Sequence, residues 1–398
     1  MRSSEDTELP LAGLRVLDLS RLLPGGYATL VLADLGADVV KVEEPGRGDY
    51  LRWMPPFAAN GEGGMHLALN RGKRSVTCDL RTPGGREVLL RLAGTADVLV
   101  ESFRPGVMDR LGLGWEALRA ANPALIYVAI SGYGADGPLA GQAGHDIDYL
   151  AHAGVLSFSG HPATGPWQPG VQVGDLGGGA WPAVVAVLAA LRVRERTGTG
   201  QFCDIAMTDG LLSWLSIHAG AHAVTGAQPQ LGRELLNGGY ACYGVYACAD
   251  GRHVAVGALE PPFFAALLAG LALPELEPWH LDASRQDELR RRIEAAFATR
   301  PRDEWVAAFA GTDACVAPVN DLGEALAGPV AAARGMVVET TLPGGAPFRQ
   351  LGVVPRLAAT PGRPGGPPSP LGADTEEVLR AAGFDAERVR VLRTEGAL

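Results

Sequence analysis

The sequence predicts an α/β protein whose larger part is a Rossmann-like, doubly wound parallel sheet, followed by a smaller α+β domain. Two observations predict this fold class. Short apolar runs typical of strands alternate with helical stretches over the first half of the chain, and parallel strands need such crossover helices. From about residue 236 the pattern changes to a hairpin followed by helices, which indicates a second domain.

The first unit of the sheet is the clearest. Residues 14–19 form an apolar strand pattern, and residues 23–26 form a Pro-Gly-Gly turn. A helical stretch follows over residues 27–37 and a second strand over residues 37–43. The order strand, helix, strand within about 30 residues is a βαβ unit.

Similar patterns continue along the chain. Further strands are expected at residues 74–80, 96–103, 123–134 and 201–207, with helices at 84–95 and 181–198 and an irregular loop at 155–173. A helical pattern at 209–224 is followed by a hairpin at 238–258 and helices at 262–272 and 285–299, and residues 340–372 form a Pro- and Gly-rich extended tail. We expect a large domain over 1–205 to which 340–398 returns, a helical linker over 206–235, and a small domain over 236–339.

Composition narrows the classes of ligand. The 398 residues carry a formal net charge of −10, with 47% hydrophobic and 20% charged residues. An acidic surface disfavours nucleic acid and anionic membranes, so an anionic ligand must meet a local basic pocket. The five cysteines lack CxxC spacing, which indicates neither a disulfide framework nor a metal site.

Targeting signals are not recognised in the sequence. The acidic residues 1–13 lack the basic start and apolar core of a signal peptide. No continuous apolar, charge-free run reaches the roughly 20 residues of a membrane helix, and the last residues are not a peroxisomal address. We therefore expect a cytoplasmic protein. GxxxxGK[ST], HExxH and GxSxG are also missing, which disfavours the commonest NTPases, metalloproteases and α/β-hydrolases.

Eight segments in series carry a family resemblance. They are LAGLRVLDLSRLLPGG, LADLGADVVKVEEP, NRGKRSV, ADVLVESFRPGVMDRLGLG, LIYVAISGYGADGP, AGHDIDYL, VGDLGGG and RTGTGQFCDIAMTDG. From about residue 10 to residue 330 the chain resembles the family III coenzyme A transferases (CaiB/BaiF) and the α-methylacyl-CoA racemases that share their fold. The resemblance implies an acyl-CoA substrate, an interlocked homodimer and a place in lipid metabolism. It implies no metal and no cofactor beyond the coenzyme A of the substrate.

His145 distinguishes the two chemistries. It lies in AGHDIDYL, just past the strand that ends in SGYG, and ligands of open α/β sheets gather at such strand ends. A histidine in an arbitrary position is more often a partly buried side chain satisfied by the backbone. The racemases have Gly-His-Asp at this place and the transferases usually have no His, so the resemblance implies that His145 is a catalytic base.

Asp175 and Glu260 complete the implied catalytic set. Asp175 lies in VGDLGGG, where it is either a helix N-cap or, by resemblance, the acid–base Asp of a racemase or the acylated Asp of a transferase. Glu260 lies in VGALEPPFF, where it is either a solvated charge at a helix start or the partner of the catalytic His. The second role would place the active site across both domains.

The resemblance implies racemisation of 2-methylacyl-CoA thioesters. His145 and Asp175 would remove and return the α-proton from opposite faces, and the Asp146 backbone N–H would hold the thioester oxygen. The alternative is a family III CoA transferase that moves CoA between carboxylic acids through an acyl anhydride on Asp175.

Cations near the N-terminal strands are candidate coenzyme A ligands. By resemblance these are Lys41, Arg71, Lys73, Arg74 and Arg104, and the alternative for each is a solvated surface charge. Residues around 53–66, including Trp53, Phe57 and His66, and the loop at 155–172 either line the acyl pocket or are ordinary packing.

Overall fold

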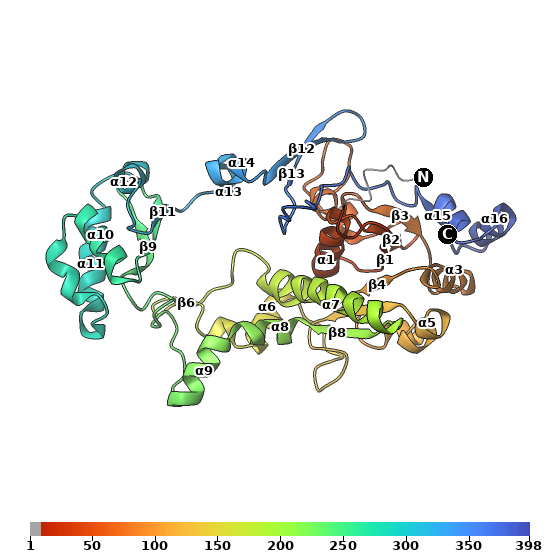
Figure 1. Ribbon diagram of the computed structural model, residues 1–398, viewed down its shortest axis with the longest axis horizontal. Coiled ribbons are helices and arrows are strands. Elements are labelled where there is room, and N and C mark those ends of the chain that lie inside the picture. Colours follow the sequence, from red (N-terminus) through yellow and green to blue (C-terminus); the bar gives the residue numbers. More distant parts are fainter. Residues whose placement is uncertain (1–8) are drawn as a thin grey trace. The chain divides into compact units, whose positions relative to one another are not determined.

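The computed structural model describes residues 9–398, so residues 1–8, part of the stretch without a signal-peptide pattern, lie outside the description. The chain divides into two compact units. Unit 1 contains residues up to 153, 171–214 and 331–398, and unit 2 contains residues 154–170 and 215–330. Figure 1 shows the elements of both units.

Unit 1 is built on a six-stranded parallel sheet. Its order is β3-β2-β1-β4-β5-β8, and every pairing in it is parallel. The strands are β1 (Arg15–Asp18), β2 (Asp38–Glu43), β3 (Arg74–Thr77), β4 (Val98–Glu101), β5 (Ile126–Ser131) and β8 (Phe202–Ala206). The predicted doubly wound fold is confirmed, because the chain builds outward from β1 in one direction and from β4 in the other.

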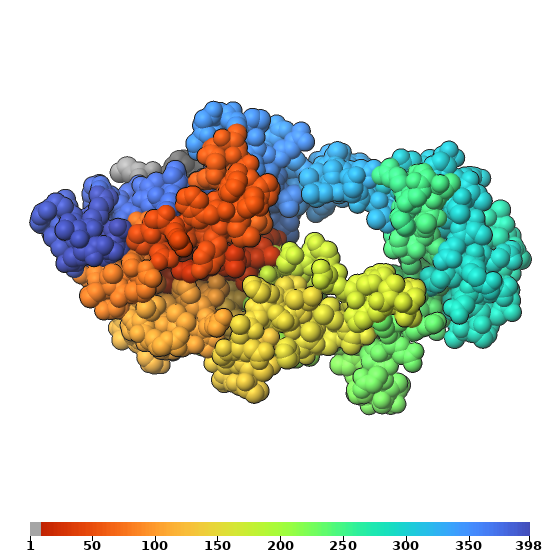
Figure 2. Space-filling model, turned by 180° about the vertical axis from the view of Figure 1, so that it is seen from behind, coloured from red at the N-terminus to blue at the C-terminus, as the bar shows by residue number. Residues whose placement is uncertain are grey.

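Helices cover both faces of this sheet. Contacts place α1 (Leu23–Asp34) and α7 (Trp181–Thr197) on one face. On the other face, side chains such as Leu17 and Leu99 pack in one buried cluster with Leu89, Leu118 and Leu392. These come from α3 (Pro83–Ala93), α5 (Trp115–Ala121) and α16 (Ala386–Thr394), joined by α15 (Thr375–Ala381). Figure 2 shows the C-terminal helices, in dark blue, against the orange segment that contains α3.

The remaining elements of unit 1 are short. They are η2 (Tyr50–Trp53), α2 (Gly64–Asn70), α4 (Val107–Arg110), α6 (Asp146–His152), the π-helix η4 (Gly174–Ala180), α8 (Met207–Trp214), β12 (Val337–Thr341) and β13 (Pro347–Leu351). The expected extended tail at 340–372 therefore begins as the second half of a hairpin, in which β12 pairs with β13.

One continuous helix, Gly174–Thr197, is long and apolar enough by length and composition to cross a membrane. It does not stand out in the sequence as an uncharged apolar run, because Asp175 lies near its start. It consists of η4 and α7, which pack against α1, β5 and β8. In α7 the side chains of Ala183, Val184 and Val187 are buried, whereas those of Val185 and Leu188 are exposed.

Unit 2 is an α+β unit with its own core. A three-stranded antiparallel sheet, β9 (Tyr243–Ala247), β10 (His253–Gly257) and β11 (Val316–Pro318), packs with α10 (Pro261–Gly270), α11 (Gln286–Phe297) and α12 (Arg302–Phe309). Its smaller elements are η3 (Val155–Ser157), β6 (Gly160–His161), β7 (Gly165–Pro166), α9 (Ser216–Thr225), η5 (Pro274–Trp279), η6 (Ala283–Arg285) and α13 (Leu322–Ala327). The helix α14 (Pro329–Ala333) straddles the boundary at residue 330.

Three boundaries differ from the expected ones. The expected small domain ends at residue 339, but residues 331–339 group with unit 1. Residues 154–170 group with unit 2, because the Asn237 amide donates a hydrogen bond to the Phe158 carbonyl and Phe158 packs on His218. The expected helix at 209–224 is interrupted at Leu215, so α8 belongs to unit 1 and α9 to unit 2.

Candidate active site

A pocket of about 430 Å³ in unit 1 contains both His145 and Asp175. We call it the His145 pocket. The strand order reverses between β1 and β4, and ligands of open α/β sheets bind at the carboxyl ends of the strands at such a reversal. The segments after β1, β4 and β5 supply most of its wall: Arg21, Leu22, Ser102, Phe103, Arg104, Pro105, Gly132, Ala140, Gln142, Ala143 and Gly144.

His145 is the N-cap residue of α6 and has an extended backbone. Its N–H donates to the Asp148 carboxylate at 2.9 Å, and its carbonyl accepts from the Asp148 N–H at 2.9 Å. The Tyr149 hydroxyl holds the preceding carbonyl, that of Gly144, at 2.5 Å. The backbone around His145 is thus held on both sides, while the side chain itself is exposed to the pocket.

Asp175 lies in the first turn of the π-helix η4, not in the N-cap position considered from the sequence. It is half-buried. Burial raises the pKa of Asp175 to about 6, the charge of Asp146 adds to this rise, and His145 opposes it. A carboxyl group with this pKa exchanges protons readily near neutral pH.

Asp146 follows His145 in the chain and contacts Asp175. It is the first residue of α6, where a backbone N–H has no partner within the helix. Its N–H has no backbone partner elsewhere in residues 9–398, which leaves the amide free to donate to a ligand. Its carboxylate accepts the Asp175 N–H at 2.8 Å.

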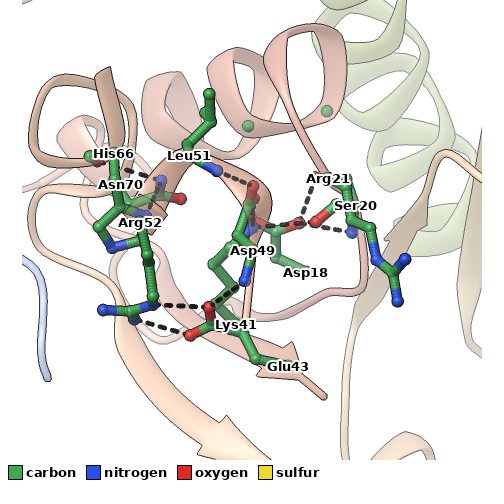
Figure 3. Close-up of polar contacts among 12 residues, drawn as sticks. Asp18, Ser20, Arg21, Lys41, Glu43, Asp49, Leu51, Arg52, His66 and Asn70 are labelled. Atoms are coloured by element: carbon green, nitrogen blue, oxygen red, sulfur yellow. Dashed lines mark hydrogen bonds and ion pairs between the residues drawn. The ribbon is translucent and has the colours of Figure 1, made fainter. Parts of the chain in front are cut away.

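The turn between β1 and α1 is held by a buried ionic cluster (Figure 3). Asp18 accepts the Ser20 N–H at 2.9 Å and the Lys73 ammonium at 3.0 Å. Lys41 lies 3.8 Å from Asp18 and 3.0 Å from Asp49. Burial alone would raise the pKa of Asp18, but the two lysines outweigh it and hold the pKa well below its usual range. The cluster fixes the chain just before Leu22, which has a φ of 61° and lines the His145 pocket.

Four of the expected coenzyme A cations have partners inside the protein. Lys41 and Lys73 belong to the buried cluster. Arg71 forms a two-point pair with Asp34, and Arg74 forms one with Asp38. Their contact with coenzyme A stays a prediction, while the structure gives them internal partners.

Arg104 differs, because it is exposed and lines the His145 pocket. Its guanidinium has no ion-pair partner within 4.0 Å among residues 9–398. The aromatic and Met residues near 53–66 do not line this pocket, and His66 is fully buried beside Asn70.

A second pocket of about 510 Å³ lies at the ends of β1, β2 and β3, and we call it the Lys41 pocket. It shares Arg21 and Phe103 with the His145 pocket. Sequence reasoning missed Arg21 and Tyr50, whose side chains meet at 3.0 Å. Arg21 could have been predicted as a site residue, because it follows the first strand and ligands bind at the carboxyl ends of such strands.

Glu260 lies in unit 2, where it is the N-cap residue of α10 and is exposed. Its proposed pairing with the catalytic histidine stays a prediction.

The fold and the pocket together define an α/β enzyme with a histidine and a protonatable aspartate at the carboxyl edge of its sheet. Residues 11–375 match the model of CoA-transferase family III, so the chain belongs to this family. It is 37% identical to human alpha-methylacyl-CoA racemase, over 97% of both chains. It is 32% identical to human succinyl-CoA:glutarate CoA-transferase, over 93% of this chain and 85% of that protein. A CaiB/BaiF family crystal structure from Brucella suis aligns with a TM-score of 0.82 and 32% identity, over 94% of this chain and 99% of that one.

Proposed function

We propose that this enzyme racemises 2-methylacyl-CoA thioesters by moving the proton on the α-carbon. The observation that carries the proposal is the presence of His145 and Asp175 in one pocket, with the pKa of Asp175 raised to about 6. An inverting proton transfer needs a base on one face of the carbon and an acid on the other. The imidazole of His145 and the carboxyl group of Asp175, whose pKa is raised, are the two groups we assign to these roles.

In each turnover His145 removes one proton and Asp175 returns one. Neutral His145 takes the α-proton, and the electron pair of that C–H bond moves into the enolate. Protonated Asp175 then delivers a proton to the opposite face of the carbon, which leaves an imidazolium and a carboxylate. The reverse reaction starts from that pair. The Asp146 N–H donates to the enolate oxygen, and such a donor typically contributes about 3 kcal/mol in the transition state.

The substrate's coenzyme A fits the arrangement of the two pockets. The thioester lies in the His145 pocket, and the nucleotide end lies in the adjoining Lys41 pocket. Arg21 and Arg104 line the His145 pocket, and Arg21, Lys41 and Arg81 line the Lys41 pocket. We assign to these cations the local positive charge that phosphates require in an acidic protein.

Deuterium exchange tests the proposal. Incubation of (R)-2-methylacyl-CoA thioesters with the protein in D2O should place deuterium on the α-carbon and yield both enantiomers. His145→Ala and Asp175→Asn should each lower this exchange by about 10²–10⁴-fold, because each removes a proton-transfer group. His152→Ala is the matched control, since His152 lies on the same helix but does not line the pocket.

The transferase alternative predicts a different outcome. The transferase relatives are nearly as similar as the racemases, and Asp175 would serve as their acylated residue. Transfer of CoA from a donor thioester to a free carboxylic acid, with no α-deuterium uptake from any branched thioester, would replace the racemase proposal by the transferase.

A further inference from the structure

We propose that the Asp146 side chain is the positioning group for Asp175, holding the first turn of η4 and placing a negative charge beside the reacting carboxyl. This role is separate from the backbone N–H of Asp146, which faces the substrate in the proposed reaction. The inference rests on the proposed function, because it assigns a partner to the acid of that reaction.

The geometry joins two elements through one contact. The Asp146 carboxylate, on the first residue of α6, accepts the Asp175 N–H at 2.8 Å. Gly174 permits this approach, because a Cβ there would lie 2.9 Å from the Asp146 Oδ1 and 3.3 Å from its carbonyl oxygen. Any larger residue at position 174 would push the carboxylate away. A glycine is therefore required before Asp175, because a side chain at position 174 would collide with Asp146.

A matching contact holds the other proton-transfer residue. The Asp148 carboxylate accepts the His145 N–H, as that of Asp146 accepts the Asp175 N–H. Two carboxylates of α6, two residues apart, thus hold the backbone of the base and of the acid. Asp146 also acts through its charge, which adds to the rise that burial causes in the pKa of Asp175.

Other titratable groups lie near Asp175. Those that line the same pocket are Arg21, Arg104, His145, Asp148 and Tyr149. Of these, His145 lowers the pKa of Asp175. The other elements packed on η4 carry Tyr27, Asp34, Asp204 and Asp209, which do not line the pocket. Asp146 is the carboxylate in direct contact with the Asp175 backbone, whose N–H it accepts at 2.8 Å.

The decisive experiment is a titration of the Asp175 carboxyl without substrate. Difference infrared spectroscopy assigns its band by comparison with Asp175→Asn. Asp146→Asn keeps an oxygen for the Asp175 N–H but removes the charge, so the midpoint should fall below about 6, toward the value near 3.9 of an exposed Asp. Asp136→Asn, an exposed loop residue outside the pocket, should leave the midpoint unchanged.

Activity gives a second readout that a purely structural role would not move. In Asp146→Asn the acid limb of the kcat/KM profile should move to lower pH together with the carboxyl titration. At a fixed pH above the midpoint, a tenfold stronger acid has about a tenfold smaller protonated fraction, so exchange there should fall in proportion. Asp146→Ala also loses the hydrogen bond, so its exchange rate should fall further.

The outcomes separate the two proposals. An unchanged Asp175 midpoint in Asp146→Asn overturns this inference even if racemisation is observed. A lowered midpoint in a protein that exchanges no α-deuterium supports the inference and overturns the racemase assignment instead.

Discussion

At the scale of single residues, carboxylates that accept backbone N–H groups build the site. Asp148 holds the amide of His145, Asp146 that of Asp175, and Asp18 that of Ser20. Hydrogen bonds to ionised acceptors are stronger than neutral ones. Because the backbone is held, the side chains of His145 and Asp175 stay available for substrate.

Asp18 accepts more hydrogen bonds than the other two carboxylates, and the contribution of its charge to stability can be tested. It is fully buried and bonds Ser20, Thr29 and Lys73. Asp18→Asn keeps the shape but leaves the buried Lys73 without a carboxylate. Removal of one partner from a buried ion pair typically destabilises a protein by about 3–5 kcal/mol. We expect the free energy of unfolding, measured by urea denaturation, to fall by this amount in Asp18→Asn.

The control for Asp18→Asn is Glu195→Gln, which breaks the exposed Arg192–Glu195 pair on α7. Exposed pairs contribute little, so its midpoint should stay close to that of the parent protein. Equal losses in the two variants would show that the charge of Asp18 has no special role.

Sequence reasoning placed His145 and Asp175 in a site but did not place Lys41 and Lys73 inside the protein. Lys41 lies near the end of β2 and Lys73 directly before β3, and lysine side chains are seldom fully buried. Their burial depends on Asp18 and Asp49, which are distant in sequence. No local pattern reports such a contact.

At the scale of elements, the π-helix η4 decides where Asp175 lies. The sequence showed three glycines after Asp175 but could not show what approaches them. A Cβ at Gly177 would lie 2.0 Å from the Trp214 ring, and one at Gly178 would lie 2.5 Å from the Met207 carbonyl. The glycines thus let α8 pack closely on η4, and π-helical turns often occur at functional sites.

Gly178→Ala tests this packing. The nearest atom to the added Cβ is a backbone oxygen, which cannot rotate away, so η4 and α8 must separate. Overpacking of this kind costs about 1–3 kcal/mol, and the displaced Asp175 should lower α-deuterium exchange. Thermal unfolding and the exchange assay measure the two effects.

Gly220→Ala is the companion variant. Gly220 lies on α9, is exposed, and has no atom within 4 Å of an added Cβ. Alanine favours a helix by about 0.5–1 kcal/mol over glycine, so this variant should be at least as stable as the parent. A Gly178→Ala protein with full stability and full exchange would contradict the close-packing argument.

At the scale of the whole molecule, the doubly wound parallel sheet followed from the sequence because each βαβ unit is local and its crossover hand is fixed, whereas the strand order comes from the structure. The division into units followed less well. Residues 154–170 lie between two segments of unit 1 along the chain, yet Asn237 and His218 draw them into unit 2. Such contacts across about 60–80 residues leave no periodic signal in the sequence.

Buried carboxylates give the molecule opposing dependences on pH. Burial opposes ionisation of Glu43, but Arg52 outweighs it and lowers the pKa to about 2. This pair contributes stability above the usual value of 4.5, and the contribution is lost as pH falls toward 2. Burial raises the pKa of Glu101 to about 7. The unfolded chain releases that proton near 4.5 and the native state near 7, so Glu101 reduces stability as pH rises through this window.

Glu101→Gln should remove that second dependence. The variant cannot ionise, and its side-chain oxygen can still accept the Phe103 N–H that Glu101 accepts. Its stability relative to the parent should therefore rise between pH 5 and pH 7 by up to about 1.4 kcal/mol per pH unit and then level off. Urea denaturation at pH 5, 6, 7 and 8 measures the difference. Glu116→Gln, at a side chain that is 81% exposed on α5, should show none. Parallel stability curves for Glu101→Gln and the parent would mean that the buried Glu101 carboxyl ionises as easily as in the unfolded chain.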